Sequence, residues 1–280
     1  MKKLLAILLL ISATAQAQGL MSLLGDEAVN SITKATFKDS RIVNAQSNEQ
    51  AAKGELKFMV QHRFGTLNSG GYNLWGLDNS KIRLGFEYGL HERLAIGFGR
   101  SSSKKEFDLS AKGKVLQQST EMPVSISAYS AIFFQHPSPT VREQSGFDMS
   151  DQFSFSNQII LTKKVNRKLS VALLPTHLHL NTEDIGETND PLFVGFGGRY
   201  KLSRRVSVNG EYFYALSQLS DAHTNVLSLG FDIETGGHVF SLHISNSRGM
   251  NERAFLVDTT GDWMDGDIYF GFNISRTFSW

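Results

Sequence analysis

The sequence has 280 residues, with 28 basic and 27 acidic side chains and no cysteine. This near-neutral balance, with basic residues scattered along the chain, argues against a nucleic-acid partner. The lack of cysteine excludes a disulfide framework, a thiolate metal site and a thiol nucleophile.

The first seventeen residues have the pattern of an export signal. Lys2 and Lys3 precede an apolar stretch from Leu4 to Ala13, and Ala15-Gln16-Ala17 follows as a small-residue cleavage site. The apolar stretch is about 10 residues long, whereas a helix needs roughly 20 to span a bilayer. We therefore expect residues 1–17 to be a signal peptide. If the mature chain crosses a membrane, it does so with strands.

The next segment, residues 18–54, lacks a clear strand pattern. Thr36 to Gln46 could form a strand, but one face would mix apolar and charged side chains. A strand there would also make the strand number predicted below odd, whereas bacterial barrels have an even number. We expect residues 18–54 to be an N-terminal segment that is periplasmic or enters the lumen.

From residue 55 onward, segments of about 10 residues alternate apolar with polar or small side chains. In residues 81–90, for example, every even position is large and apolar and every odd position is charged or glycine. This period of two predicts strands with one apolar face. The twelve expected strands are 55–64, 80–90, 94–102, 105–117, 124–134, 152–164, 169–180, 192–202, 206–216, 225–235, 238–247 and 267–280.

Short and mostly longer linkers alternate between these strands, with Ser101 to Lys105 as the one short linker on the long side. Outer-membrane barrels have short periplasmic turns and longer extracellular loops. The sequence therefore predicts an all-β protein: a single up-and-down antiparallel transmembrane β-barrel over residues 55–280, in the bacterial outer membrane, with the C-terminus in the periplasm. A soluble β-sandwich is the alternative. The export signal and the charges and glycines on the polar face argue against it.

The last segment, Ile268 to Trp280, has apolar residues at alternate positions and ends on an aromatic residue. It resembles the C-terminal assembly signal of outer-membrane barrels, which implies the barrel-assembly machinery as a partner, beside outer-membrane lipid and lipopolysaccharide. Arg276 departs from that signal, because it places a cation on the lipid-facing side. Near the interface an arginine can extend its charge into water at little cost. No specific protein partner is predicted.

Taken whole, the chain resembles a family of outer-membrane β-barrel proteins of Bacteroidota whose function is unknown. The resemblance covers about residues 35–280 and implies a fold and a compartment, but no reaction. It rests on the stretches Gly54-Glu55-Leu56, Gln61-His62-Arg63-Phe64-Gly65, Phe196-Gly197-Gly198-Arg199-Tyr200, Thr260-Gly261-Asp262-Trp263 and Gly271-Phe272-Asn273-Ile274-Ser275-Arg276.

Charged side chains of both signs occupy the inward positions of the predicted strands. They either line an aqueous path or form an ion-pair network that fills the barrel, with Arg83 and Arg199 locked to Glu87 and Glu211. Twelve strands do not decide between a filled and an open barrel. The residues predicted to line the lumen are Arg63, Arg83, Glu87, Lys112, Arg199, Lys201, Glu211 and Asp232.

Inward glycines, among them Gly85, Gly99, Gly195 and Gly197, are expected to leave lumen space. They favour a non-enzymatic barrel that passes or binds small polar solutes. A structural or accessory barrel, whose long loops or N-terminal segment hold a partner, is one alternative.

A lipid hydrolase is the other alternative. His243-Ile244-Ser245-Asn246 resembles the His-x-Ser-Asn of outer-membrane phospholipase A and lipid A deacylase barrels, in which a base pairs with a serine nucleophile. Those enzymes present the pair to lipid, whereas the alternation here turns His243 and Ser245 toward the lumen. The glycine that commonly follows the asparagine is also missing. We therefore assign no catalytic residue.

Two further clusters were weighed as metal sites. Asp258, Asp262, Asp265 and Asp267 could supply oxygen ligands to calcium, but aspartates and glycines are ordinary turn residues and their spacing fits no ligand loop. His177 and His179 share one strand face without an evident third ligand. The sequence predicts no metal and no cofactor.

Overall fold

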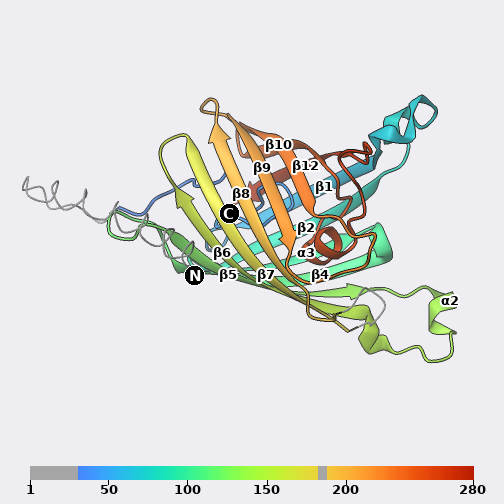
Figure 1. Cartoon of the computed structure of the whole chain (residues 1–280). Coiled ribbons are helices and arrows are strands. Elements are labelled where there is room, and N and C mark those ends of the chain that lie inside the picture. The colour runs from blue at the N-terminus through green and yellow to red at the C-terminus, as the bar shows by residue number, and fades with distance from the viewer. Residues whose placement is uncertain (1–30, 182–187) are drawn as a thin grey trace, which may run out of the picture.

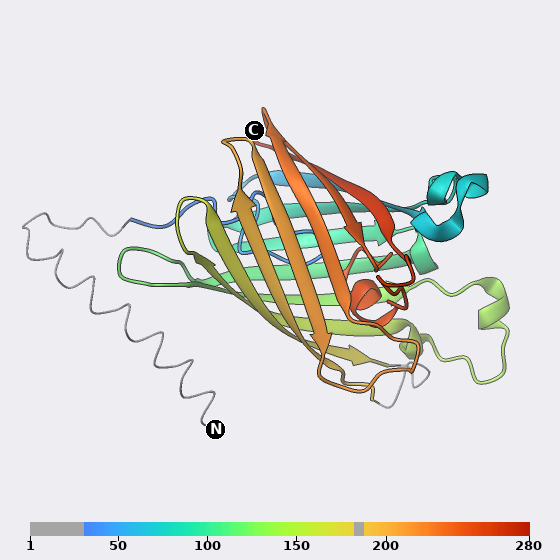
Figure 2. The ribbon, with the colours of Figure 1, turned by 45° about the horizontal axis from the view of Figure 1, so that its top comes forward.

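The computed structural model describes residues 31–181 and 188–280, so the predicted signal peptide lies outside the described residues. Twelve strands form one closed antiparallel sheet, in which sequence neighbours pair and β1 pairs with β12 (Figures 1 and 2). This confirms the predicted twelve-stranded up-and-down barrel. The strands are β1 (Leu56–Thr66), β2 (Lys81–His91), β3 (Leu94–Ser101), β4 (Glu106–Leu116), β5 (Ser125–Gln135), β6 (Phe153–Lys164), β7 (Leu169–Leu180), β8 (Leu192–Lys201), β9 (Val206–Ala215), β10 (Val226–Thr235), β11 (His238–Ser245) and β12 (Tyr269–Phe278).

The helices are short and lie in the linkers. Among the described residues, no helix is long and apolar enough to cross a membrane. The helices are η2 (Leu67–Ser69), η3 (Gly71–Gly76), η4 (Ser103–Lys105), α2 (Pro139–Arg142), η5 (Met149–Gln152) and α3 (Glu252–Val257).

The alternation of side chains gives the barrel an apolar exterior and an interior that is largely polar but carries buried apolar side chains on β5–β9, such as Phe133, Leu174 and Phe213. On β2, Leu84 and Phe86 are about two-fifths exposed on the outside, whereas Arg83 between them is buried on the inside. Gln61 and Asp108 are also buried inward-facing side chains. Closure of the ladder satisfies the backbone groups of the strands, and the outer apolar side chains suit a hydrocarbon surround. The polar interior needs other partners.

Residues 36–53, which we call the plug segment, lie inside the barrel. Their middle part folds back on itself: Arg41 bridges Gln46, and the backbone N–H of Ile42 donates to the carbonyl of Ala45 at 2.8 Å. The segment enters and leaves at the end of the barrel where β12 ends. There, Lys38 donates to the carbonyl of Arg204 in the turn between β8 and β9, and the Gly54 N–H donates to the carbonyl of Gly89 near the end of β2. Figure 2 shows this blue trace inside the sheet.

The linker between β11 and β12 closes the opposite end of the barrel. It carries α3, whose Phe255, Leu256 and Val257 are buried in an apolar cluster that also contains Phe37 and Ile42 of the plug segment. The Phe255 ring meets Phe213 of β9 edge-on, with 5.1 Å between the ring centroids. The plug segment and α3 thus fill the lumen from its two ends.

We expect the mature protein to migrate faster on a gel before boiling than after it, because a closed barrel resists detergent unfolding and stays compact. The measurement is heat-modifiable mobility of protein extracted from membranes with detergent. Mature protein that is released in soluble form without detergent would contradict the transmembrane barrel.

Candidate functional site

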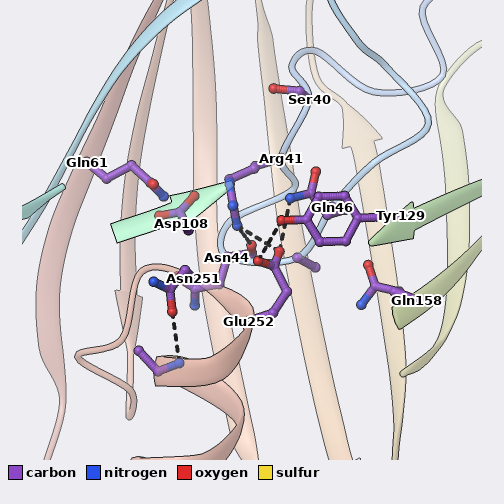
Figure 3. A network of polar contacts seen from close by, with 12 residues as sticks. Ser40, Arg41, Asn44, Gln46, Gln61, Asp108, Tyr129, Gln158, Asn251 and Glu252 are labelled. Carbon is purple, nitrogen blue, oxygen red and sulfur yellow. Dashed lines mark hydrogen bonds and ion pairs between the residues drawn. The ribbon is translucent and has the colours of Figure 1, made fainter. Parts of the chain in front are cut away.

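The plug segment and α3 meet at the carboxylate of Glu252, which is fully buried (Figure 3). Its Oε1 accepts hydrogen bonds from Arg41 Nη1 at 3.1 Å and Gln46 Nε2 at 3.0 Å, and its Oε2 accepts one from the Tyr129 hydroxyl of β5 at 3.1 Å. The Arg41–Glu252 pair is also a salt bridge between two buried side chains. One carboxylate therefore joins the plug segment, α3 and the barrel wall.

A second buried carboxylate, Glu211 of β9, holds the tip of the plug segment. It accepts hydrogen bonds from three successive backbone N–H groups, those of Val43 at 3.1 Å, Asn44 at 2.8 Å and Ala45 at 2.9 Å. Hydrogen bonds to an ionised acceptor are shorter and stronger than neutral ones. The predicted lumen residue Glu211 thus recognises the backbone of the turn rather than a cation.

Ion pairs anchor the stem of the plug segment. Asp39 pairs with Lys57 of β1, with 2.8 Å between Oδ1 and Nζ. Burial raises the pKa of Asp39. The Lys57 ammonium and the hydrogen bonds to the carboxylate lower it by more, so the pKa of Asp39 lies below its ordinary value. Asp39 is therefore charged at neutral pH. Lys112 of β4 lies 3.5 Å from Glu87 and donates to Oε1 of Gln46 at 3.2 Å.

The buried arginines have partners other than those expected from the sequence. Arg83 pairs with Asp108, not with Glu87, through bonds of 2.9 Å and 2.5 Å. Arg199 donates to the carbonyl of Thr36 in the plug segment at 2.8 Å, not to Glu211. The ion pairs considered for a filled barrel, of Arg83 and Arg199 with Glu87 and Glu211, do not form, because Asp108 and the plug segment come closer.

Of the remaining lumen residues, Arg63 and Asp232 also bind the wall or the plug segment. Arg63, fully buried, donates to the Asn44 side chain at 2.6 Å and to Asn273 of β12 at 3.2 Å. Asp232 accepts a hydrogen bond from Asn209 at 2.6 Å. Lys201, two residues beyond Arg199, is partly exposed at the end of β8.

The expectation that inward glycines leave open space is wrong. A side chain at Gly195 would overlap the Phe213 ring, and one at Gly197 would overlap the end of Ile42. Beside Gly85 and Gly99 lies the Arg83 guanidinium. The glycines make room for neighbouring side chains and for the plug segment.

A small cavity remains beside the plug segment, lined among others by Arg41, Lys57, Glu87, Lys112 and Tyr129. Its volume is about 40 Å³. A water molecule needs roughly 10–15 Å³ measured in this way, so the cavity accommodates a few waters and no larger solute. The plug segment therefore fills this part of the lumen.

The hydrolase motif does not assemble a base and a nucleophile. His243 and Ser245 are buried on the inner face of β11, and among the described residues no hydrogen-bond partner is found for either ring nitrogen of His243. The Ser245 hydroxyl instead accepts hydrogen bonds from the Ser228 hydroxyl at 2.9 Å and from the backbone N–H of Ser247. Asn246 binds the backbone of Asn225 and Gly261. The Asn246 side chain thus links the β9–β10 and β11–β12 linkers.

The two clusters weighed as metal sites have protein partners. Asp258 pairs with Lys104 and Arg253, and Asp267 accepts from Asn68. His177 and His179 both contact Oδ1 of Asp190 on the exterior of the barrel. Within residues 31–181 and 188–280, no group of three or more histidine or acidic side chains could hold a metal ion.

Sequence reasoning missed Glu252, Arg41, Asp39 and Tyr129. Glu252 lies in the long linker before Asp258, and Arg41 and Asp39 lie in the segment without strand periodicity. Charged side chains within otherwise mixed, non-periodic segments were the one available signal.

Several solved barrels resemble this structure. The NanC porin has 7% sequence identity and a TM-score of 0.49, over 80% of this chain and 100% of that chain. The KdgM porin has 8% identity and a TM-score of 0.47, over 81% and 99%. An outer-membrane channel from Pseudomonas putida F1 has 12% identity and a TM-score of 0.49, over 83% and 98%.

Comparison of the sequence with family models identifies the family of this chain. No curated protein is significantly similar to this chain in sequence. The model of a family described as a membrane-bound β-barrel domain, DUF5777, matches residues 37–278, which include both the plug segment from its second residue and the whole barrel. The chain therefore belongs to the DUF5777 family of membrane-bound β-barrel domains.

Proposed function

We propose that this barrel is a non-enzymatic protein of the bacterial outer membrane that passes or binds small polar solutes, and that the plug segment and α3 act as its gate. The observation that carries the proposal is the way in which the plug segment is held inside the barrel. A separate segment, held by hydrogen bonds and ion pairs to the wall and α3, occupies the charged part of the lumen. Its departure would expose inward charged side chains such as Lys57, Arg83 and Glu211 to water.

The gate can move without unfolding the barrel. The plug segment contributes no strand to the closed ladder, so its release breaks no pairing between neighbouring strands. The Lys57, Glu211 and Glu252 side chains would regain water when the segment leaves. This hydration offsets much of the interaction that is lost, because buried ion pairs carry a large desolvation cost.

The proposal extends to orientation and source. The turns at the end where β12 finishes, such as 92–93 and 236–237, are short, and the linkers at the other end include 136–152 and 246–268. Barrels of the outer membrane have short turns on the periplasmic side. We infer a periplasmic C-terminus, with the plug segment entering from the periplasm, and a source among the Bacteroidota.

A disulfide across the gate tests its movement. The Asn44 side chain donates to the Ser228 hydroxyl of β10 at 3.0 Å, and the chain has no native cysteine. In the variant Asn44→Cys with Ser228→Cys, we expect oxidised protein in a planar bilayer to be silent and reduced protein to show discrete conductance steps. After reoxidation the conductance steps should disappear again.

Each single cysteine variant is the matched control, and its conductance should not respond to the redox state. Folding of both states is checked by heat-modifiable mobility. If well-folded, reduced protein and the parent protein are both silent at all voltages, the gated pathway is refuted, and a structural role becomes the better account.

Loss of the central carboxylate should favour opening. Glu252→Gln leaves the Arg41 guanidinium buried without a counter-charge, and breaking a buried pair in this way costs about 3 kcal/mol or more. We expect the open probability in single-channel recordings to rise at least tenfold. Asp262→Asn, on the same linker but exposed, is the control and should leave the open probability unchanged. Equal open probabilities in the two variants would contradict the assigned role of Glu252.

A further inference from the structure

The barrel wall recognises the plug segment through its backbone. Three N–H groups, those of residues 43–45, point at the Glu211 carboxylate. The carbonyl groups are bound as well: Asn273 donates to the Val43 carbonyl at 3.1 Å, and Arg199 donates to the carbonyls of Ala35 and Thr36 at 3.1 Å and 2.8 Å. Because every peptide carries these groups, such contacts do not depend on the side chains of the segment.

Side-chain contacts then impose a pattern. Asp39 meets the Lys57 ammonium, and Arg41, two residues later, meets the Glu252 carboxylate. The next residue, Ile42, places its terminal carbon against Gly197, where the wall has no side chain, in the apolar cluster. The wall and α3 therefore provide, in order, a site for an acid on β1, a site for a base on α3 and a site for an aliphatic side chain on β8.

The two carboxylates that bind the segment come from elements far from it in sequence, whereas Lys57 lies 18 residues from Asp39. Glu211 lies 166 to 168 residues from the atoms it binds, and Glu252 lies 211 residues from Arg41. Nothing in this arrangement requires the segment to be part of the same chain. The tether to β1 supplies a high local concentration of the segment, which for short flexible linkers is in the millimolar range.

We propose that the lumen is a binding site for a short peptide supplied in trans, and that the plug segment occupies it as a tethered peptide in the closed state. This inference rests on the proposed function, whose solute class it names. The ligand has an acidic residue two positions before a basic one, an aliphatic residue directly after the base, and then a tight turn whose N–H groups face Glu211.

The first test uses the full mature chain with residues 36–53 replaced by a Gly/Ser linker of equal length. The probe is a fluorescently labelled synthetic peptide with the sequence of residues 36–51, and binding is followed by fluorescence anisotropy in detergent. We expect saturable binding about 100-fold tighter than to the parent chain, in which the tethered segment competes. A scrambled peptide should not bind.

Two sets of variants show where the peptide binds. Glu211→Ala in the linker background should weaken binding at least tenfold, whereas Asp190→Ala, a carboxylate on the exterior, should not. A peptide with the change Arg41→Glu should lose binding to the linker protein and regain it when the barrel carries Glu252→Lys. Such rescue requires the peptide to lie beside residue 252, inside the barrel.

The second test needs no change to the chain. Excess probe peptide should displace the tethered segment in the parent protein, so the amides of residues 43–45 should exchange with deuterium at least tenfold faster than without peptide. The proposal is overturned if the peptide neither binds the folded linker protein nor accelerates this exchange. It is distinct from the conductance experiment: silent bilayers with intact peptide binding would refute passage of solutes but not the peptide site.

Discussion

Closure of the ladder between β1 and β12 is the constraint on which the other features of this protein depend. A closed sheet has no edge, so all its strand pairing is internal and its outer face can be apolar. The same closure isolates the inner face, where Arg63, Glu211 and Asp232 are buried. Buried charges need partners within the protein. The plug segment and α3 supply many of them.

The polar contacts of the lumen form two layers. Near the end of the barrel where β12 finishes, the stem of the plug segment pairs with the wall through Asp39 and Lys57. Deeper inside, its tip and α3 converge on Glu211 and Glu252. Each layer involves a different part of the segment, so the segment is fixed in depth as well as in orientation. An apolar cluster around Phe255 and Ile42 covers the side facing α3.

The strands could be predicted from the sequence because a barrel preserves the period of two along every strand. Predicted and observed bounds are the same for β7 (169–180) and differ by two residues at each end of β12. The same parity placed Arg83, Arg199 and Glu211 on the inner face. The parity of a strand position does not show which ion-pair partner a side chain has. Asp108 and Glu87 lie on the same face as Arg83, and only distance decides which of them Arg83 binds.

The filling of the lumen could not be predicted for a related reason. Glu211 binds backbone N–H groups, which every residue except proline carries, so no residue type in 43–45 marks the contact. Parity also gave the correct face for Gly195 and Gly197, but whether a glycine leaves a space depends on what packs against it. Here Phe213 and Ile42 do.

The plug segment enters and leaves the barrel at the same end, and this one-sided entry determines how it responds to force. It can be drawn out as a loop, without passing a chain end through the ring of strands. A pull on the residues before it would load the contacts one after another: first that of Arg199 with Thr36, then Lys57 with Asp39, and last Glu211 at the tip. Contacts loaded one after another break at a lower force than contacts loaded together, so the same set of contacts resists a pull from that side less than it resists a push on the whole segment.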